Sequence, residues 1–196
     1  MISTLDCILE NAHARLAPVR ADDFEALSQI VFDPVIWEWT VDKIETQADL
    51  ENYVAECVGA REQGVRFAYT VTGRTGLLAG VTALGNYSPK DRRIEIGWTW
   101  LAQQFWGTAI NANAKALLLS LCFERLEMER VEFKTDLLNT RARSALKKIG
   151  CTEEGVLRSH TLMHDGRRRD TVYYSILRHE WAASALRSAT TIEKNA

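Results

Sequence analysis

The sequence lacks the features that mark several large classes of protein. Its 196 residues carry a formal net charge of only −2, which gives no overall attraction to nucleic acid or to an anionic membrane surface. No apolar run approaches the ~18 residues of a membrane-spanning helix. The first residues include Asp6 and Glu10 and no basic segment, so they do not resemble a secretory signal. These absences favour a globular cytoplasmic protein.

Cysteine is scarce and scattered. Cys7, Cys57, Cys122 and Cys151 form no Cys-x-x-Cys pair and no cluster with histidine, so no metal site is predicted. Reduced thiols, as in most cytoplasmic proteins, are the plain interpretation. The composition, 46% hydrophobic and 26% charged, suits one domain with a sizeable core. We expect one domain over residues 1–196, with a loose lead-in at 1–13 and a C-terminal tail at 182–196.

Hydrophobic periodicity predicts strands and helices in mixed order. Alternation and β-branched bias predict strands at 15–19, 65–71, 77–84, 93–101, 130–136, 153–163 and 169–177. Helical spacing predicts helices that begin near Asp22, Thr46 and Asn139, and another over about residues 110–126. Hairpins combined with strand–helix–strand crossovers predict an α+β fold with one mixed sheet.

The most informative stretch joins a strand to a helix through a short turn. Ile94, Ile96, Trp98 and Trp100 are predicted to share one face of the strand, and Glu95 lies on the other. The turn that follows contains small residues, so a ligand can approach its backbone closely. The first N–H groups of the helix and its dipole then favour an anion beyond the end of the strand.

The turn Gln104-Phe105-Trp106-Gly107-Thr108-Ala109 resembles the Gln/Arg-x-x-Gly-x-Gly/Ala motif with which GNAT N-acetyltransferases bind the pyrophosphate of acetyl-CoA. Residues 139–150 resemble the later asparagine-led helix of that fold, and 154–181 resemble the ending of its RimJ/RimL-like branch. The resemblance covers roughly residues 14–181. It implies a GNAT-type fold: a mixed central sheet with splayed central strands, helices on both faces, and the pantetheine arm lying in the gap between the strands.

The resemblance also implies acetyl-CoA as co-substrate, without a metal. The phosphates would contact backbone N–H groups of Gln104, Phe105, Trp106, Gly107, Thr108, Ala109 and Ile110. The backbone of Gly97, Trp98, Thr99, Trp100 and Leu101 would contact the pantetheine and the thioester oxygen. Asn139 would hydrogen-bond the arm of the cofactor as well as cap its helix. The plainer alternatives are an ordinary strand–helix connection for the turn and a cap alone for Asn139.

Aminolysis of a thioester requires removal of a proton from the amine and donors for the oxygen and the leaving thiolate. Glu95 is the candidate general base, because it leaves the apolar face of the strand and matches a position used as base in several family members. A carboxylate satisfied by Arg93 or by solvent is the alternative. Tyr173 and Tyr174 are candidate acids. They point to opposite faces of a strand, so at most one can face the cofactor, and packing is the alternative for both.

Trp37, Glu38 and Trp39 follow the first helix, where the resembled fold lines its acceptor site. An aromatic and acidic rim would suit a cationic amine or a peptide N-terminus, whereas core packing is the alternative. Two positions depart from the branch pattern: Asn113 stands where relatives have Glu, and Ala142 where they have Ser. Neither change removes a backbone contact, but a catalytic role of that serine cannot be carried over.

Three functions follow as hypotheses. The favoured one is an acetyl-CoA-dependent N-acetyltransferase that moves an acetyl group to a primary amine, on a small molecule or a protein N-terminus, by direct attack in a ternary complex. A non-catalytic CoA-binding module on the same fold is the second. RNA or ribosome-surface binding through Arg167, Arg168 and Arg169 is the third, although a solvated hairpin is plainer there. Relatives are often dimers, and residues 181–188 could support a homodimer.

Overall fold

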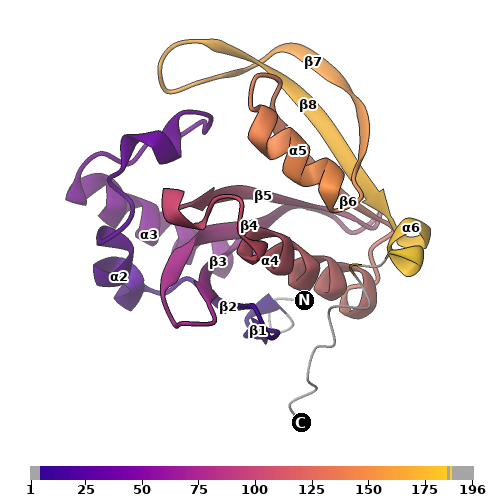
Figure 1. The fold of residues 1–196 in the computed structure, drawn as a ribbon, viewed down its shortest axis with the longest axis horizontal. Coiled ribbons are helices and arrows are strands. Elements are labelled where there is room, and N and C mark those ends of the chain that lie inside the picture. The colour runs from indigo at the N-terminus through magenta and orange to yellow at the C-terminus, as the bar shows by residue number, and fades with distance from the viewer. Residues whose placement is uncertain (1–4, 185, 187–196) are drawn as a thin grey trace.

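The computed structural model describes residues 5–184 and 186 of the chain. Within this part, one eight-stranded sheet has the order β1-β2-β3-β4-β5-β6-β8-β7 (Figure 1). The strands are β1 (Leu9–Glu10), β2 (Ala14–Pro18), β3 (Arg66–Gly73), β4 (Leu78–Ser88), β5 (Arg93–Leu101), β6 (Arg130–Asp136), β7 (Thr152–Leu162) and β8 (Arg168–Leu177). β5 and β6 pair in parallel, and the other neighbours pair antiparallel. The predicted α+β fold with one mixed sheet is confirmed.

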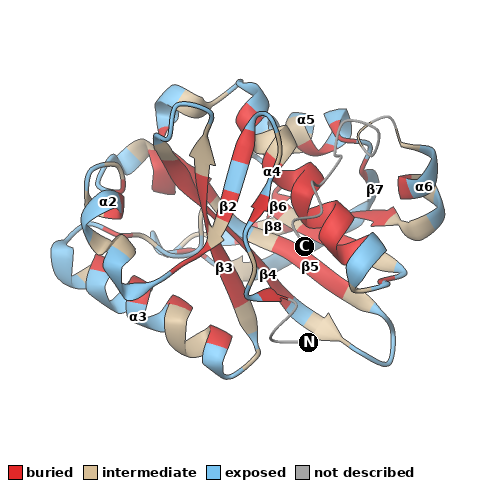
Figure 2. Cartoon of the chain, turned by 90° about the horizontal axis from the view of Figure 1, so that it is seen from below, coloured by how far each residue is buried: buried red, intermediate tan, exposed pale blue. Residues whose placement is uncertain are grey.

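Helices cover both faces of the sheet. They are α2 (Phe24–Ser28), α3 (Gln47–Glu62), α4 (Ala109–Ser120), α5 (Thr140–Lys148) and α6 (Arg178–Ala183), with short 3-10 turns η1 (Ala21–Asp23), η2 (Pro34–Trp37) and η3 (Gln103–Phe105) and a π-helical turn η4 (Leu121–Arg125). Residues of α4, α5 and α6 join one core against the sheet, and residues of α2, η2 and α3 join a second. Buried residues follow the central strands and α4 (Figure 2). No helix in the described ranges has the length and apolar character needed to cross a membrane.

The chain ends differ from the expected lead-in and tail. The lead-in is not loose throughout, because Leu5 and Leu9 are buried in the first core and β1 pairs with β2. Trp181 is buried as well and stacks on Phe123, with 5.9 Å between the ring centroids, so its side chain is committed to packing. Of the expected tail, 182–184 and 186 belong to the described residues, and the remainder lies outside them.

A β-bulge in β5 changes the faces that its second half presents. Val81 of β4 pairs with Trp100, whereas Ala83 pairs with Gly97, so β5 has one extra residue between these pairs. Trp98 lies in the bulge with a φ of 49°, a conformation that a bulky residue rarely adopts. The prediction that Trp98 and Trp100 share a face with Ile94 and Ile96 is therefore wrong: Trp100 packs in the second core, while both isoleucines pack in the first.

The two central strands, β5 and β6, diverge partway along their length. The parallel ladder contains the pairs Arg93–Arg130, Ile94–Val131 and Glu95–Glu132 and then stops. Both strands continue with their outer neighbours, β5 to Leu101 and β6 to Asp136. In Figure 1, β5 and β6 meet at the right of the view. From there β5 crosses the middle, while β8, the other neighbour of β6, passes over α5. The expected splay of the central strands is thus present, and it leaves backbone groups of β5 and β6 without a ladder between them.

Helix α4 anchors the site to the core, so truncating its buried side should cost stability. Leu117 has no exposed surface, and we expect Leu117→Ala to lower the free energy of unfolding by about 2–5 kcal/mol through lost burial and a residual cavity. The matched control is Leu77→Ala in the β3–β4 turn, where the side chain is 58% exposed and a change within about 0.5 kcal/mol is expected. Urea denaturation measures both, and equal losses would contradict this assignment of the core.

Candidate active site

The N-terminus of α4 presents unpaired donors at the end of β5. Thr108 caps the helix, with its Oγ1 accepting a hydrogen bond from the N–H of Ile110 at 3.4 Å. Gly107 has a φ of +73°, and a Cβ placed there would meet no atom within 4 Å. Within the described chain, the N–H groups of Gly107 and Ala109 find no acceptor. Free N–H groups at the positive end of a helix, beside open space, suit a phosphate group.

The start of α5 follows β6, on the other side of the place where the pairing of β5 and β6 is interrupted beyond Glu95 and Glu132. This interruption of the strand pairing is called the opening below. Asn139 caps this helix, because its Oδ1 accepts a hydrogen bond from the N–H of Ala142 at 2.9 Å. The guanidinium carbon of Arg141 lies 3.3 Å from the centroid of the Trp106 ring, in a stacked cation–π contact. Trp106 in turn donates from Nε1 to the carbonyl of Leu101 at 2.8 Å. The turn after β5 and the asparagine-led helix are therefore in contact, although Trp106 and Arg141 lie 35 positions apart in the sequence. The cap role of Asn139 is confirmed.

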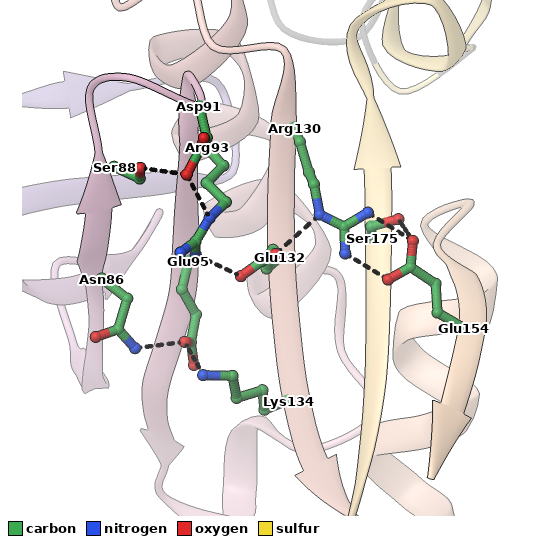
Figure 3. Close-up of polar contacts among 10 residues, drawn as sticks. All are labelled: Asn86, Ser88, Asp91, Arg93, Glu95, Arg130, Glu132, Lys134, Glu154 and Ser175. Atoms are coloured by element: carbon green, nitrogen blue, oxygen red, sulfur yellow. Dashed lines mark hydrogen bonds and ion pairs between the residues drawn. The ribbon is translucent and has the colours of Figure 1, made fainter. Parts of the chain in front are cut away.

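Glu95 lies at the point where the ladder between β5 and β6 stops. Its side chain is only 7% exposed, and its Oε2 accepts hydrogen bonds from Asn86 Nδ2 and from Lys134 Nζ, each at 2.7 Å (Figure 3). Its Oε1 lies beside Gly97, where an added Cβ would come within 3.1 Å of it. No described group donates a hydrogen bond to Oε1. Oε2 is thus fixed by two partners, whereas Oε1 has no hydrogen-bond donor among the described residues.

Lys134 connects Glu95 to one of the two candidate tyrosines. Burial lowers the pKa of Lys134, but hydrogen bonds to Glu95 and Tyr173 and the charges of those groups outweigh it, so the pKa lies above its usual value. Its Nζ lies 5.1 Å from the centroid of the Tyr173 ring. Tyr174 lies in the opposite core with no exposed surface, and its hydroxyl donates to Glu153 at 2.8 Å. Of the two, Tyr173 is the one on the face of Glu95.

A buried lysine holds the bulge of β5 from the side of α4. Lys115 is 5% exposed, and its Nζ donates to the hydroxyl oxygens of Thr82 at 3.0 Å and Thr99 at 2.6 Å. Thr99 also contacts the carbonyl of Gly97 at 3.2 Å, just before the bulge. Burial lowers the pKa of Lys115 to about 7. α4 is thus linked through Thr99 to the backbone segment that was predicted to contact the thioester.

The expected acceptor segment divides between core and surface. Trp37 is buried, packs 5.3 Å from the ring of Trp100 and donates from Nε1 to the carbonyl of Val31. The expectation that its side chain lines an open rim is wrong, because aromatic packing takes it into the second core. Glu38 is exposed, and Trp39 is half-buried with the guanidinium of Arg167 at 5.8 Å from its ring. For Glu38 and Trp39 the acceptor rim remains a prediction.

The basic hairpin is largely engaged within the protein. Arg167 pairs with the buried carboxylate of Asp136 at 2.5 Å, and Arg168 bonds to Ser159. Arg169 is 9% exposed and faces the sheet. Because Arg167 and Arg168 are bonded within the protein and Arg169 is largely buried, the hairpin does not present three free arginines to a partner, which weakens the hypothesis of RNA binding there.

A ladder of charges closes the sheet on the side where β5 and β6 still pair. Arg93 contacts Glu132 at 3.3 Å, and Arg130 bridges Glu132 and Glu154 (Figure 3). Alternating charges across neighbouring strands stabilise their register. This arrangement confines the unpaired stretch to the other half of β5 and β6, and it gives Arg93 a partner other than Glu95.

Three residues of this site were missed from the sequence. Lys134 stood on the polar side of the strand at 130–136, but only the parallel register brings it to Glu95. Asn86 fell in a segment expected to be a loop, whereas β4 continues to Ser88. Lys115 shares a helical face with the apolar residues at 118 and 122, and that position among core residues was the available signal.

The residues at the opening fit a CoA thioester. Free N–H donors at the start of α4 match its pyrophosphate, and the unladdered backbone of β5 offers groups that a pantetheine arm can pair with. The fit depends on main-chain donors, so neither Asn113 nor Ala142 disturbs it. In the ranges that the structure describes, His, Cys, Asp and Glu side chains form no group of three or more arranged to hold a metal ion.

Comparison with known proteins gives a consistent result. The sequence matches the family model described as "Acetyltransferase (GNAT) domain" over residues 13–152. The Bacillus subtilis protein named "Putative ribosomal N-acetyltransferase YdaF" is 38% identical over 106 residues, which cover 54% of this chain and 57% of that protein. The match therefore spans less than two thirds of the length of this relative.

Solved structures share the fold over nearly the whole chain. A GCN5-related N-acetyltransferase from Brucella melitensis is 26% identical with a TM-score of 0.82, over 93% of this chain and 83% of that one. Mycobacterium smegmatis RimJ in complex with CoA-disulfide has a TM-score of 0.82 over 93% of each chain. Its identity is 24%, so this likeness concerns the fold alone.

The turn before α4 generates a test of cofactor binding. We expect Gly107→Val to weaken binding of acetyl-CoA at least tenfold, because a side chain at a φ of +73° strains the turn and fills the space beside the free donors. Gly150→Val is the matched control, since Gly150 has a φ of +89° with equally open surroundings at the far end of α5. Calorimetric titration measures both, and unchanged affinity in folded Gly107→Val would remove the turn from the cofactor site.

Lys115 generates a test of stability against pH. Because its native pKa of about 7 lies below the ordinary lysine value of 10.5, the unfolded chain binds more protons between these values, and stability should rise with pH in that window. Relative to Lys115→Met, the wild type should gain at most about 1.4 kcal/mol per pH unit between pH 7.5 and 9.5. Urea denaturation across this range provides the measurement. Exposed Lys90→Met is the control, and parallel curves for wild type and Lys115→Met would contradict the burial of an uncharged amine.

Proposed function

The chain belongs to the GNAT acetyltransferase family, and on this premise we propose that it transfers an acetyl group from acetyl-CoA to a primary amine. The observation that carries the proposal is the parallel ladder that stops after Glu95 and Glu132. Beyond that pair, free main-chain groups, the N-terminus of α4 and an oriented carboxylate converge on one opening. Acetyl-CoA, when bound, supplies an acetyl group activated as a thioester.

Binding is the first task of these residues. The N–H groups of Gly107 and Ala109 bind the pyrophosphate, helped by the dipole of α4. The backbone from Gly97 to Leu101 pairs with the pantetheine arm, and Asn139 contributes its side-chain amide while its Oδ1 caps α5. Holding two substrates in one geometry accounts for much of the acceleration of a bimolecular transfer.

Proton removal is the second task. An amine such as a lysine side chain has a reference pKa of about 10.4, so it arrives largely as an ammonium and must lose a proton before it attacks. Glu95 accepts that proton at Oε1, directly or through a water molecule, while Asn86 and Lys134 hold Oε2. The amine nitrogen then bonds to the thioester carbon, and the bond from that carbon to sulfur breaks. The nitrogen loses one further proton, which balances the proton taken up by the leaving thiolate.

Charge that develops on the thioester needs donors. Main-chain N–H groups of Trp98 and Thr99 in the bulge would stabilise the oxygen, and Lys115 supports this segment through its hydrogen bond to Thr99. Tyr173 is the candidate to return a proton to the leaving thiolate, because it lies on the face of Glu95 and next to Lys134. Tyr174 has no part in this proposal, because its hydroxyl is engaged with Glu153 on the other side of the sheet.

The name of the Bacillus subtilis relative supports a protein acceptor. That protein carries "ribosomal N-acetyltransferase" in its name, so the N-terminus of a ribosomal protein is the acceptor we propose to examine first. A peptide panel and a panel of small amines, each assayed for release of free thiol from acetyl-CoA, test the function. Turnover with any primary amine supports it. Tight binding of CoA without turnover on any acceptor would favour the non-catalytic module instead.

Removing the proposed base should slow the reaction without weakening the binding of acetyl-CoA. We expect Glu95→Gln to lower kcat about 10²-fold or more, since general-base catalysis contributes 10²- to 10⁴-fold, and to leave the affinity for acetyl-CoA unchanged. The shape of the pH–rate profile should also change, because the proposed base is lost. Initial rates from pH 6 to 9 provide the measurement.

Glu132→Gln is the matched control for this variant. Glu132 is the cross-strand partner of Glu95 and is equally isosteric with glutamine, but it bonds to Arg93 and Arg130 rather than facing the opening. We expect it to retain most of the activity. Equal losses in the two variants, or an unaltered pH–rate profile in Glu95→Gln, would remove Glu95 as the base.

A further inference from the structure

The guanidinium of Arg169 has few partners and lies on the same face of the sheet as the proposed base. Arg169 is 9% exposed, and its Nε donates to the hydroxyl of Thr171 at 3.0 Å. Across the described residues, its two terminal nitrogens have neither a hydrogen-bond acceptor nor a carboxylate within ion-pair distance. Among the described residues, the fully buried side-chain nitrogen that lacks a hydrogen-bond partner is Arg178 Nη2. The terminal nitrogens of Arg169 therefore keep some contact with solvent.

A buried guanidinium without an anion is energetically unfavourable. Taking a charge out of water is costly unless a partner of opposite sign and good geometry replaces the water. Asp136, whose charge acts on Arg169 more strongly than that of Glu95, already pairs with Arg167 at 2.5 Å and accepts a hydrogen bond from the N–H of Leu138 at 2.9 Å. The fork of Arg169 therefore remains open toward whatever enters from the solvent.

The strand register relates this fork to the transfer site. Tyr173 of β8 pairs with Lys134, which holds Glu95, and Thr171 pairs with Asp136. Residues 169, 171 and 173 alternate onto one face, and the bond to Thr171 turns the Arg169 side chain back along that face. Two residues of a strand span about 7 Å, so the guanidinium above Thr171 lies about that far from Tyr173.

The electrostatics of Arg169 agree with this placement. Burial lowers its pKa, and the charges of Asp136 and Glu95 partly offset that effect. The charge of Glu95, the proposed base, thus acts on Arg169, although the two residues come from β5 and β8 and share no hydrogen bond.

We propose that Arg169 binds a carboxylate of the acceptor, so that the acceptor is an amine that also carries an acidic group. This inference rests on the proposed function. A guanidinium matches a carboxylate with two parallel N–H···O bonds, and the pair replaces the missing counter-charge of Arg169. The amine then lies at Glu95 and the carboxylate at Arg169, as in a peptide whose first or second residue is Asp or Glu, or in a free amino acid.

The test compares acidic acceptors with their amides. Peptides that begin with Asp or Glu are assayed beside peptides that begin with Asn or Gln, all with amidated C-termini. Free aspartate and glutamate are assayed beside their diamides, which carry no carboxylate. We expect the wild type to show a kcat/KM about 10- to 100-fold higher for the acid in at least one of these two arms, in line with a hydrogen bond to a charged group. The arm in which the preference appears identifies the source of the carboxylate.

Variants assign that preference to one side chain. Arg169→Gln should abolish the preference for the acid while retaining turnover of the amide and affinity for acetyl-CoA, and Arg169→Lys should retain part of it. Arg168→Gln is the matched control, because Arg168 is the neighbouring arginine of β8, lies on the other face and is exposed. It should leave the preference intact.

The outcomes separate this inference from the proposed function. Equal kcat/KM for acids and amides in the wild type overturns the inference even if Arg169→Gln fails to fold, and leaves the acetyltransferase proposal standing. Loss of the preference in Arg168→Gln to the same extent as in Arg169→Gln also overturns it. Absence of thiol release with every acceptor, acid or amide, contradicts the proposed function itself.

Discussion

The interruption of one parallel strand pair determines what this fold can bind. β5 and β6 share three residue pairs and then diverge, and ion pairs from Arg93 and Arg130 hold the closed end together. Main-chain groups that a continuous sheet would satisfy are left open beside the N-terminus of α4. Buried peptide groups need partners, so an extended ligand that can pair with a strand is the natural occupant of such a gap. In our account, the pantetheine arm of the cofactor thus pairs with the open strand and takes the place of a missing strand in the sheet.

The β-bulge and the buried lysine make this opening a fixed feature. The extra residue at Trp98 turns the second half of β5, so that Trp100 packs with Trp37 in one core while Thr99 faces α4 and Lys115. An aromatic residue at positive φ and an amine in an apolar core both carry a cost, which the surrounding packing must offset. Features of this kind tend to gather at functional sites. Here both converge on the backbone segment proposed to contact the thioester, which links the strain to the chemistry.

The sequence predicted the strands and helices well, and the side-chain geometry poorly. Strand alternation, helical spacing and the motif around Gly107 follow local rules, so the mixed sheet and the start of α4 could be predicted. The bulge at Trp98 could not, because a single inserted residue shifts the pairing without leaving a pattern in the sequence, and this error assigned Trp98 and Trp100 to the wrong face. Lys134 and Arg169 approach Glu95 only through register across three strands. The burial of Trp37 could not be predicted either, because it depends on packing against Trp100, a residue 63 positions later.

The central claim is that the opening beside Gly107 binds acetyl-CoA. The most direct measurement is calorimetric titration of the purified protein with acetyl-CoA and, separately, with CoA. Our account predicts saturable 1:1 binding of both, since the proposed contacts are made to the pyrophosphate and pantetheine that the two ligands share. Absence of binding to either ligand by the folded protein would contradict it, and would mean that the chain has kept the fold of its family without the site.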